Sequence, residues 1–152
     1  EKLIINLKEG QEIDELTVQR NIGISKEYNI FELQNSLVRR DVEKVFRIVN
    51  YFEANPKNNP IIPSITILFN FFTKVMLAHI NSTKQDREFA SIIGVSPFFV
   101  KDYRNACRSF SRGKVIEAIK ALHEADLQSK GIGYNNITEG DIMKELVYKL
   151  LN

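Results

Sequence analysis

Residues 22–56 read IGISKEYNIFELQNSLVRRDVEKVFRIVNYFEANP, and they predict two helices joined by a tight turn. Asn29 is a residue type that caps helix N-termini, and Glu32 follows it at capping-box spacing. Asp41 is placed to cap the second helix, and Pro56 marks its end. We therefore expect a helical hairpin with one apolar side. That side is formed by Ile30, Leu33, Leu37, Val42, Val45, Phe46, Val49 and Phe52.

The rest of the sequence also predicts helices, with short connections between them. Pro and Asn residues mark a loop at PKNNPIIP, after which a helix should begin at Ile61 or Ser64. Cap and turn residues delimit a helix-turn-helix within residues 87–109, a long helix from 112 to 130 and a last helix from 141 to 151. The fold class expected is all-α, a bundle of about seven or eight helices.

The segment SITILFNFFTKVMLAHI is apolar on nearly all sides, so it fits either a membrane span or a core helix. Asn70, Lys74 and His79 interrupt it, and Pro63 shortens the apolar run below the ~20 residues that a bilayer requires. A lysine near the middle of a membrane span would cost kilocalories. The sequence therefore favours a core helix, and no membrane partner is expected.

Composition excludes several classes of protein. A chain of 152 residues suits one domain, and a formal net charge of +2 leaves no polybasic or acidic tail. The single cysteine, Cys107, excludes an internal disulfide and leaves too few thiols for a structural zinc site. Because a chain with one cysteine does not rely on disulfides, we expect a reducing, intracellular setting, the cytoplasm.

Five stretches of the sequence, taken in order, resemble one family. They are IGISKEYNIFEL, RRDVEKVFRIVNYFEANPKNNP, ILFNFFTKVMLAH, FASIIGVSPFFVKDY and a helix that ends EADLQSKG. This order resembles the delta subunit of the bacterial DNA polymerase III clamp loader, where its AAA+-like lid ends and its C-terminal collar begins. The collars of the gamma and delta-prime subunits are helical too, but the phrase IGISKEYNIFEL favours delta.

The resemblance implies a division of the chain. Residues 1–23, which contain the predicted helical segments LIINL and DELTVQRNI, would be a remnant of the lid domain, and residues 24–152 would be the helical collar. Because the sequence starts at Glu1 without Met, we expect it to be a piece of a longer protein. The clamp-opening element of the family lies in an N-terminal domain, so none of its residues is assigned in this sequence.

The resemblance also implies a function in DNA replication. The collar would assemble delta with the delta-prime and gamma/tau subunits through contacts between helices. The full-length complex would then load the sliding clamp on primer-template DNA for a DNA-directed DNA polymerase, which is a nucleotidyltransferase. No small-molecule substrate is implied for this part of the protein.

Residues 87–109 leave open a second function, which is DNA binding. Gly94 lies where a helix-turn-helix needs its turn glycine, and Ser96 with Pro97 supplies the cap and first residue of the second helix. The residues that would meet base edges are then Pro97 and Phe98, and neither has the polar groups that read a base. Helix-turn-helix geometry without base readout is the preferred interpretation.

Charged residues on two helices are candidates for specific roles. Lys101, Arg104 and Arg108 form a basic stripe at i, i+3 and i+7, which suits contact with phosphates or an acidic partner but also an ordinary solvated face. Asp126 lies at the edge of an apolar face with Lys130 one turn later, so we expect a structural ion pair. The two residues also match a DxxxK ending of the family. We expect Asp126 to fix its helix against neighbouring helices.

The sequence offers no catalytic motif. A Walker loop, a Ser-His or Cys-His pair and carboxylates at metal-binding spacing are all missing from it. The GIGY segment, residues 131–134, follows a helix rather than a strand, so it does not predict a nucleotide site. A hydrolase built on Asp126 or His79 would need a further titrating group, which the spacing does not provide. We therefore expect no catalytic residue, no metal and no cofactor in this chain.

Overall fold

The computed structural model describes residues 25, 27–133 and 136–152, and throughout this part of the chain the regular structure is helical. The helices are α3 (Ile30–Arg39), α4 (Val42–Ala54), α5 (Ile61–Ile80), α6 (Asp86–Ile93), the 3₁₀-helix η1 (Pro97–Phe99), α7 (Val100–Ser109), α8 (Arg112–Ser129) and α9 (Glu139–Leu151). The all-α prediction is confirmed. The predicted lid remnant, residues 1–23, lies outside the described residues.

The predicted hairpin is present as α3 and α4, with both caps in place. The Asn29 side chain accepts hydrogen bonds from two backbone N–H groups of the first turn of α3, and Asp41 Oδ1 accepts one from Lys44 N at 3.0 Å. These bonds satisfy N–H groups that have no partner inside a helix. The two helices are also joined by the Lys44–Glu32 ion pair, whose Nζ and Oε2 atoms are 2.7 Å apart.

One residue that was predicted to lie on the buried apolar side, Val42, is exposed, so this part of the prediction is wrong. Val42 is 51 % exposed, whereas Val45, Val49 and Phe52 are buried. Val42 is the first residue of α4 and follows directly on the turn, so it lies ahead of the part of the helix that packs against α3 and α9.

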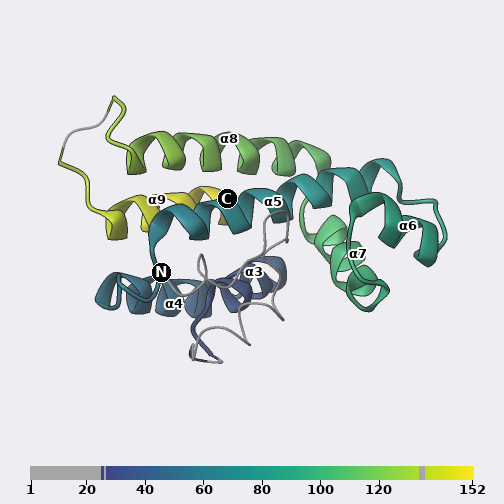
Figure 1. Ribbon diagram of the computed structural model, residues 1–152, viewed down its shortest axis with the longest axis horizontal. Coiled ribbons are helices and arrows are strands. Elements are labelled where there is room, and N and C mark those ends of the chain that lie inside the picture. Colours follow the sequence, from purple (N-terminus) through teal and green to yellow (C-terminus); the bar gives the residue numbers. More distant parts are fainter. Residues whose placement is uncertain (1–24, 26, 134–135) are drawn as a thin grey trace, which may run out of the picture.

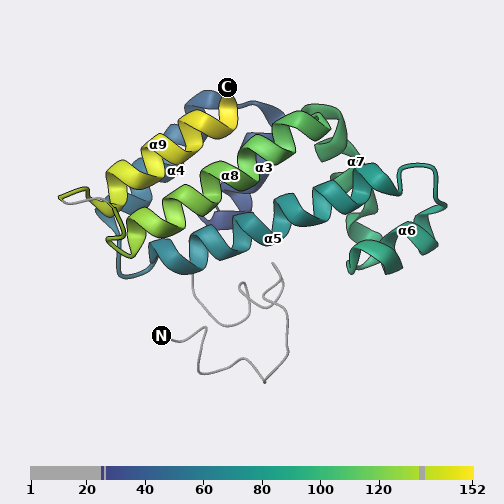
Figure 2. The same ribbon diagram turned by 90° about the horizontal axis from the view of Figure 1, so that it is seen from above.

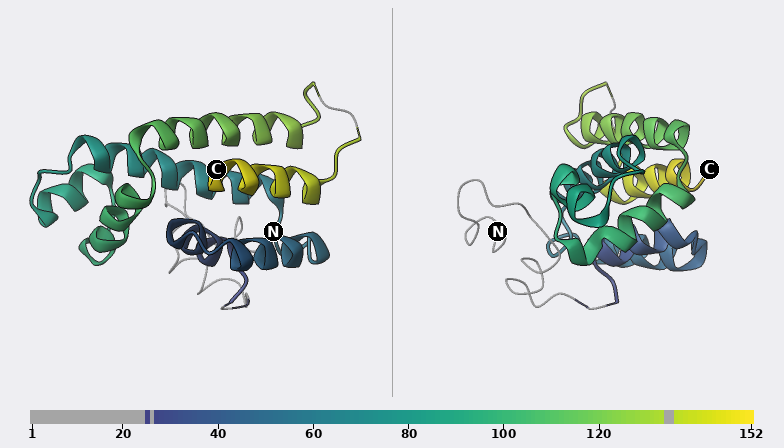
Figure 3. Two further views of the ribbon diagram at one scale, coloured as in Figure 1. Left: turned by 180° about the vertical axis from the view of Figure 1, so that it is seen from behind. Right: turned by 90° about the vertical axis from the view of Figure 1, so that its right-hand side faces the viewer.

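The helices form three layers with an extension at one end (Figure 1). Helix α8 forms one outer layer, α5 and α9 the middle layer, and the hairpin α3–α4 the other outer layer, an arrangement that is also visible from behind (Figure 3). From above, α9, α8 and α5 lie side by side, while α6 and α7 pack around the far end of α5 (Figure 2). Helix α5 thus contacts α3, α6, α7 and α8.

Helix α5 combines great length with a buried inner side. It is the one helix in the described part of the chain that is long and apolar enough to cross a bilayer. Its inward residues, however, belong to the same core as those of α3, α4, α8 and α9. The prediction of a core helix therefore fits this packing. The buried residues of α5 are Ile61, Ser64, Ile65, Ile67, Leu68, Phe71, Phe72, Val75 and Ala78.

Aromatic rings fill the centre of this core. Phe72 is fully buried, and its ring meets the ring of Phe110 edge to face with centroids 5.1 Å apart. The neighbouring ring of Phe71 lies 5.2 Å from Phe72 and is also edge-on. Edge-to-face contacts of this kind add to the gain from burial. Phe72 and Phe110 thereby connect α5 to the corner between α7 and α8.

The first prediction concerns this core. Phe72→Ala should lower the free energy of unfolding by about 3–5 kcal/mol, because it leaves a cavity where three rings meet. Phe98→Ala is the matched control: Phe98 is 81 % exposed, so its loss should change stability by less than about 0.5 kcal/mol. Urea unfolding followed by circular dichroism measures both variants. Equal effects of the two substitutions would contradict the central position of Phe72.

Candidate functional site

The predicted helix-turn-helix is present in the structure. Gly94 ends α6 in the left-handed region at φ 68°, where a residue with a Cβ would be strained. The Ser96 side chain accepts a hydrogen bond from Phe98 N at 3.4 Å. The second helix differs from the expectation, because its first turn is the 3₁₀-helix η1 and α7 starts only at Val100. Phe98, at the position that would meet bases, exposes its ring to solvent.

The three cations of the predicted basic stripe have different surroundings. The Arg104 guanidinium donates to Asp86 Oδ1 at 2.8 Å and to the backbone oxygens of Ser82 and Lys84 at 3.0 and 2.9 Å. It also lies over the Phe89 ring, 4.4 Å from the centroid. Arg104 thereby fixes the loop before α6. Lys101 is exposed, and contact of the stripe with phosphates or a partner stays a prediction.

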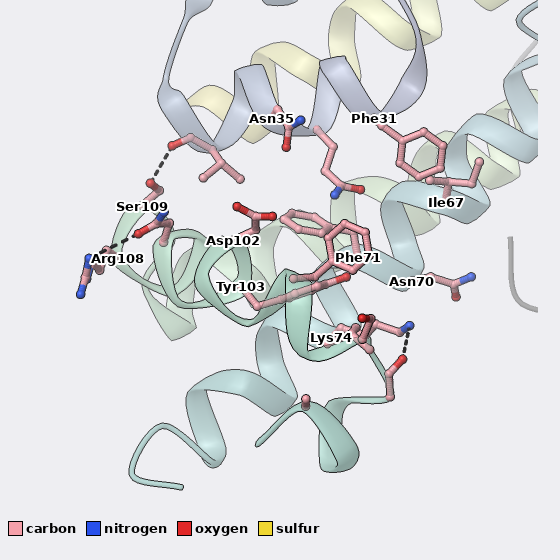
Figure 4. Close-up of a pocket in the computed structure, with 18 of the residues that line it drawn as sticks. Phe31, Asn35, Ile67, Asn70, Phe71, Lys74, Asp102, Tyr103, Arg108 and Ser109 are labelled. Atoms are coloured by element: carbon pink, nitrogen blue, oxygen red, sulfur yellow. Dashed lines mark hydrogen bonds between the residues drawn. The ribbon is translucent and has the colours of Figure 1, made fainter. Parts of the chain in front are cut away.

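A groove of about 840 Å³ lies between α3, α5 and the segment from α6 to α7 (Figure 4). Phe31 of α3 and Phe71 of α5 lie at its base and are almost fully buried. The Phe71 ring is in contact with the ring of Tyr103 from α7, with centroids 5.5 Å apart. Figure 4 shows Asn35 and Asp102 pointing into the space from opposite walls.

Cations from all three walls line the groove. They are Arg39 at the end of α3, Lys74 in α5 and Arg108 in α7, and the lining contains one acidic residue, Asp102. Lys74 Nζ donates to the backbone oxygen of Gly94 at 3.0 Å, and Arg108 donates to Asn105 Oδ1 at 3.3 Å. Because Arg39 and Arg108 are exposed, the groove has a positively charged rim.

Arg40, which no signal in the sequence indicated, connects three parts of the fold. It lies in the turn between α3 and α4 in the left-handed region, at φ 58°. Its guanidinium donates to the backbone oxygen of Leu151 and, at 3.1 Å, to that of Ser109, and it lies 5.0 Å from the centroid of the Phe110 ring. The Ser109 hydroxyl donates to the backbone oxygen of Val38 at 2.6 Å. These contacts fix the corner of the groove where α3 and α7 end.

Asp126 and Lys130 are close enough for the expected ion pair, with Oδ2 and Nζ 2.7 Å apart. Both residues belong to the C-terminal end of α8, and the Asp126 backbone oxygen accepts a hydrogen bond from Ser129 Oγ. A different pair joins α8 to its neighbour, because Lys149 Nζ of α9 lies 2.7 Å from Glu124 Oε2. The expected role of Asp126 in fixing α8 against other helices stays a prediction.

His79 and Cys107, two further side chains of reactive types, both lie against backbone oxygens of neighbouring helices or their ends. His79 Nε2 lies 2.7 Å from the backbone oxygen of Phe110, so the imidazole belongs to the corner between α7 and α8. Burial raises the pKa of the Cys107 thiol, with a smaller opposing effect from the charge of Arg104. A raised pKa reduces the thiolate that a nucleophile requires at neutral pH. Among the described residues, no group of three or more His, Cys, Asp or Glu side chains is placed to hold a metal ion.

The described residues form an all-helical module, and comparison with known proteins gives its family. Residues 27–143 match the family model of the DNA polymerase III delta subunit, C-terminal domain. The chain belongs to this family, and the resemblance found in the sequence is confirmed.

The helical arrangement is also found in a solved structure, the Bacillus subtilis DNA clamp loader delta protein (YqeN). The TM-score is 0.67 and the sequence identity 23 %, so the likeness concerns the fold. The match covers 89 % of this chain but 39 % of the Bacillus protein, so the chain corresponds to less than half the length of that structure. A search of curated proteins finds no match.

The second prediction tests the role of Arg104. Arg104→Ala should lower the free energy of unfolding by about 1–2 kcal/mol, because it removes charge-assisted hydrogen bonds to two carbonyl oxygens and the contact with Phe89. Amide hydrogen exchange should also become faster in the loop of residues 81–85. Lys101→Ala, in the same helix, is the control and should change neither quantity. Unchanged exchange in Arg104→Ala would show that the loop does not depend on this side chain.

The third prediction concerns Asp126. Since its partner lies one turn away on the same partly exposed helix surface, Asp126→Asn should lower the free energy of unfolding by only about 0.3–0.5 kcal/mol. Thermal unfolding of the two proteins in parallel measures the difference. A loss above about 1.5 kcal/mol would instead support the expected role of Asp126 in fixing α8 against its neighbours.

Proposed function

We propose that residues 24–152 are the collar of a clamp-loader delta protein, and that residues 1–23 are the end of its lid domain. The collar holds delta in a ring with the delta-prime and gamma/tau subunits through helix-on-helix contacts. The assembled complex loads the sliding clamp on primer-template DNA in the cytoplasm. Membership of the delta C-terminal family and the all-helical fold support this function.

The observation that carries the proposal is an apolar stripe along the outer side of α5. Six exposed positions of this helix, residues 62, 66, 69, 73, 77 and 80, recur at helical spacing and lie on one side. Four of them are large apolar residues, namely Ile62, Phe69, Leu77 and Ile80. The stripe extends from Ile62 to Ile80, which is about 27 Å at 1.5 Å per residue.

The polar residues within the stripe do not make it hydrophilic. Thr66 Oγ1 donates to the backbone oxygen of Ile62, and Thr73 Oγ1 donates to that of Phe69, at 3.0 and 2.9 Å. Each threonine hydroxyl is therefore satisfied by its own helix, and no acidic or basic residue occupies the stripe. An exposed apolar surface of this kind is typical of a protein interaction site. A straight, uncharged helix side suits the packing of a partner helix.

Sequence-specific DNA binding by residues 87–109 is less well supported. Lys101 and Arg108 are exposed and suit phosphate contacts, but Asp102 is exposed beside them and Phe98 occupies the position for base readout. In addition, Arg104 is occupied by contacts within the chain. The α5 stripe contains no cation, so it favours a protein partner.

The fourth prediction tests assembly through the stripe. In the whole delta protein, Phe69→Glu combined with Leu77→Glu should reduce incorporation into a complex with delta-prime and gamma/tau at least tenfold, because two charges would be buried in an apolar contact. Co-elution on size exclusion measures incorporation. Phe98→Glu, which adds one carboxylate at an exposed aromatic position outside the stripe, should assemble normally.

Two results would refute this assignment. One is normal assembly of the Phe69→Glu, Leu77→Glu protein with an unchanged melting temperature. The other is tight, strongly salt-dependent duplex binding that Lys101→Glu with Arg108→Glu abolishes, because it would favour the DNA-binding alternative.

A further inference from the structure

We propose that the groove between α3, α5 and α7 binds an acidic peptide segment of a partner protein. This surface is separate from the apolar stripe, although both use α5. The inference does not depend on the assembly function, because it arises from the charge, the amide groups and the apolar base of the groove.

Charge is the first observation. The groove is lined by Arg39, Lys74 and Arg108, which come from three helices, and by a single carboxylate, that of Asp102. The two arginines lie at the exposed rim, where planar guanidinium groups bind carboxylates through paired hydrogen bonds. An occupant with Asp or Glu residues near its ends would therefore complement this rim.

The side-chain amides in the groove are the second observation. Gln34 and Asn35 of α3, Asn70 of α5 and Asn105 of α7 all belong to the lining. A carboxamide both donates and accepts hydrogen bonds, which is what the alternating N–H and C=O groups of an extended peptide require. The Asn105 oxygen already accepts a hydrogen bond from Arg108. Two of the four, Gln34 and Asn35, are adjacent on α3 and are only partly buried.

The apolar base of the groove is the third observation. The half-buried Phe99 contributes most of the accessible apolar surface among the three residues that form this base, since Ile67 and Phe71 are almost fully buried. The Phe71 ring is held in contact with Tyr103. A volume of about 840 Å³ is sufficient for several residues of a peptide. An apolar side chain of the occupant would fill this base, while its acidic residues pair with the rim.

These features favour a peptide over a nucleic acid. Phe31 and Phe71 are buried with their rings packed into the protein, so they do not offer open faces for stacking with bases. Asp102 points into the groove and would repel a phosphate backbone (Figure 4). The carboxylates of a bound peptide can pair with the rim arginines away from Asp102. The continuous phosphate backbone of a nucleic acid would instead run past the Asp102 carboxylate and be repelled by it.

The binding assay uses the full 152-residue chain and three fluorescein-labelled peptides of twelve residues. The first consists of Asp, Glu, Leu and Phe. In the second, each acid is replaced by Lys, and in the third, each Leu and Phe is replaced by Ser. Fluorescence anisotropy should detect binding of the first peptide with at least tenfold higher affinity than that of either other peptide. A fluorescein-labelled single-stranded oligonucleotide is measured in parallel.

Two variants locate the binding in the groove. Arg39→Glu combined with Arg108→Glu should weaken the first peptide about tenfold or more by reversing the rim charge. Ser91→Trp should have a similar effect without a change in charge, because it fills the groove from the side of α6. Lys57→Glu combined with Lys120→Glu is the matched control: it reverses two exposed charges outside the groove and should bind as the unaltered chain does. Thermal unfolding confirms that each variant is folded.

Four outcomes would overturn the proposal. In the first, the basic peptide binds at least as tightly as the acidic one. In the second, the groove variants and the control variant lose the same amount of affinity for the acidic peptide. In the third, the oligonucleotide binds more tightly than the peptide, and its binding requires Arg39 and Arg108. The fourth is self-association, detected by sedimentation, that Ser91→Trp abolishes, because it would make a second copy of the chain the occupant.

Discussion

Burial of the inner side of α5 is the constraint on which the rest of the structure depends. This helix is apolar on nearly all sides, and helices α3, α6, α7 and α8 pack against it. Phe72 has no exposed surface and meets Phe110, so the corner between α7 and α8 is fixed by the same contact. Because the neighbouring helices cover the inner side of α5, its outer residues, such as Phe69 and Leu77, remain in contact with solvent. The core and the apolar stripe are thus two sides of one helix.

Local signals in the sequence were sufficient for most of the helices and their caps, although α7 begins at Val100, three residues after the predicted first position, Pro97. Asn29, Asp41 and Gly94 act through bonds or dihedral angles within a few residues, and each lies where the sequence placed it. The position of Val42 was predicted wrongly, because helical spacing identifies an apolar side without showing where along the helix its partner begins. Arg40 gave no signal, since its partners are the carbonyl oxygens of Ser109 and Leu151, which are distant in the sequence.

The candidate surfaces depended still more on tertiary structure. Lys101, Arg104 and Arg108 share a spacing that suggests one basic stripe, yet Arg104 is directed to carbonyl oxygens of the loop before α6. The groove combines residues of α3, α5 and α7, and its charge becomes apparent only when these helices are side by side. The sequence does show apolar residues around nearly the whole of α5, but this pattern predicted a core helix and not an exposed apolar stripe.

Two surfaces on one helix can have separate partners if they differ in chemistry. Phe69 and Asn70 are consecutive residues of α5, so their side chains point about 100° apart. Phe69 therefore lies in the stripe, whereas Asn70 faces the groove. Binding along the stripe is governed by apolar burial, which added salt does not weaken. Binding in the groove involves exposed guanidinium groups, whose attraction to carboxylates is weakened by added salt. The screening length is about 8 Å at physiological ionic strength and becomes shorter as salt rises. Ionic strength therefore separates the two contacts experimentally, even though the same helix supports both.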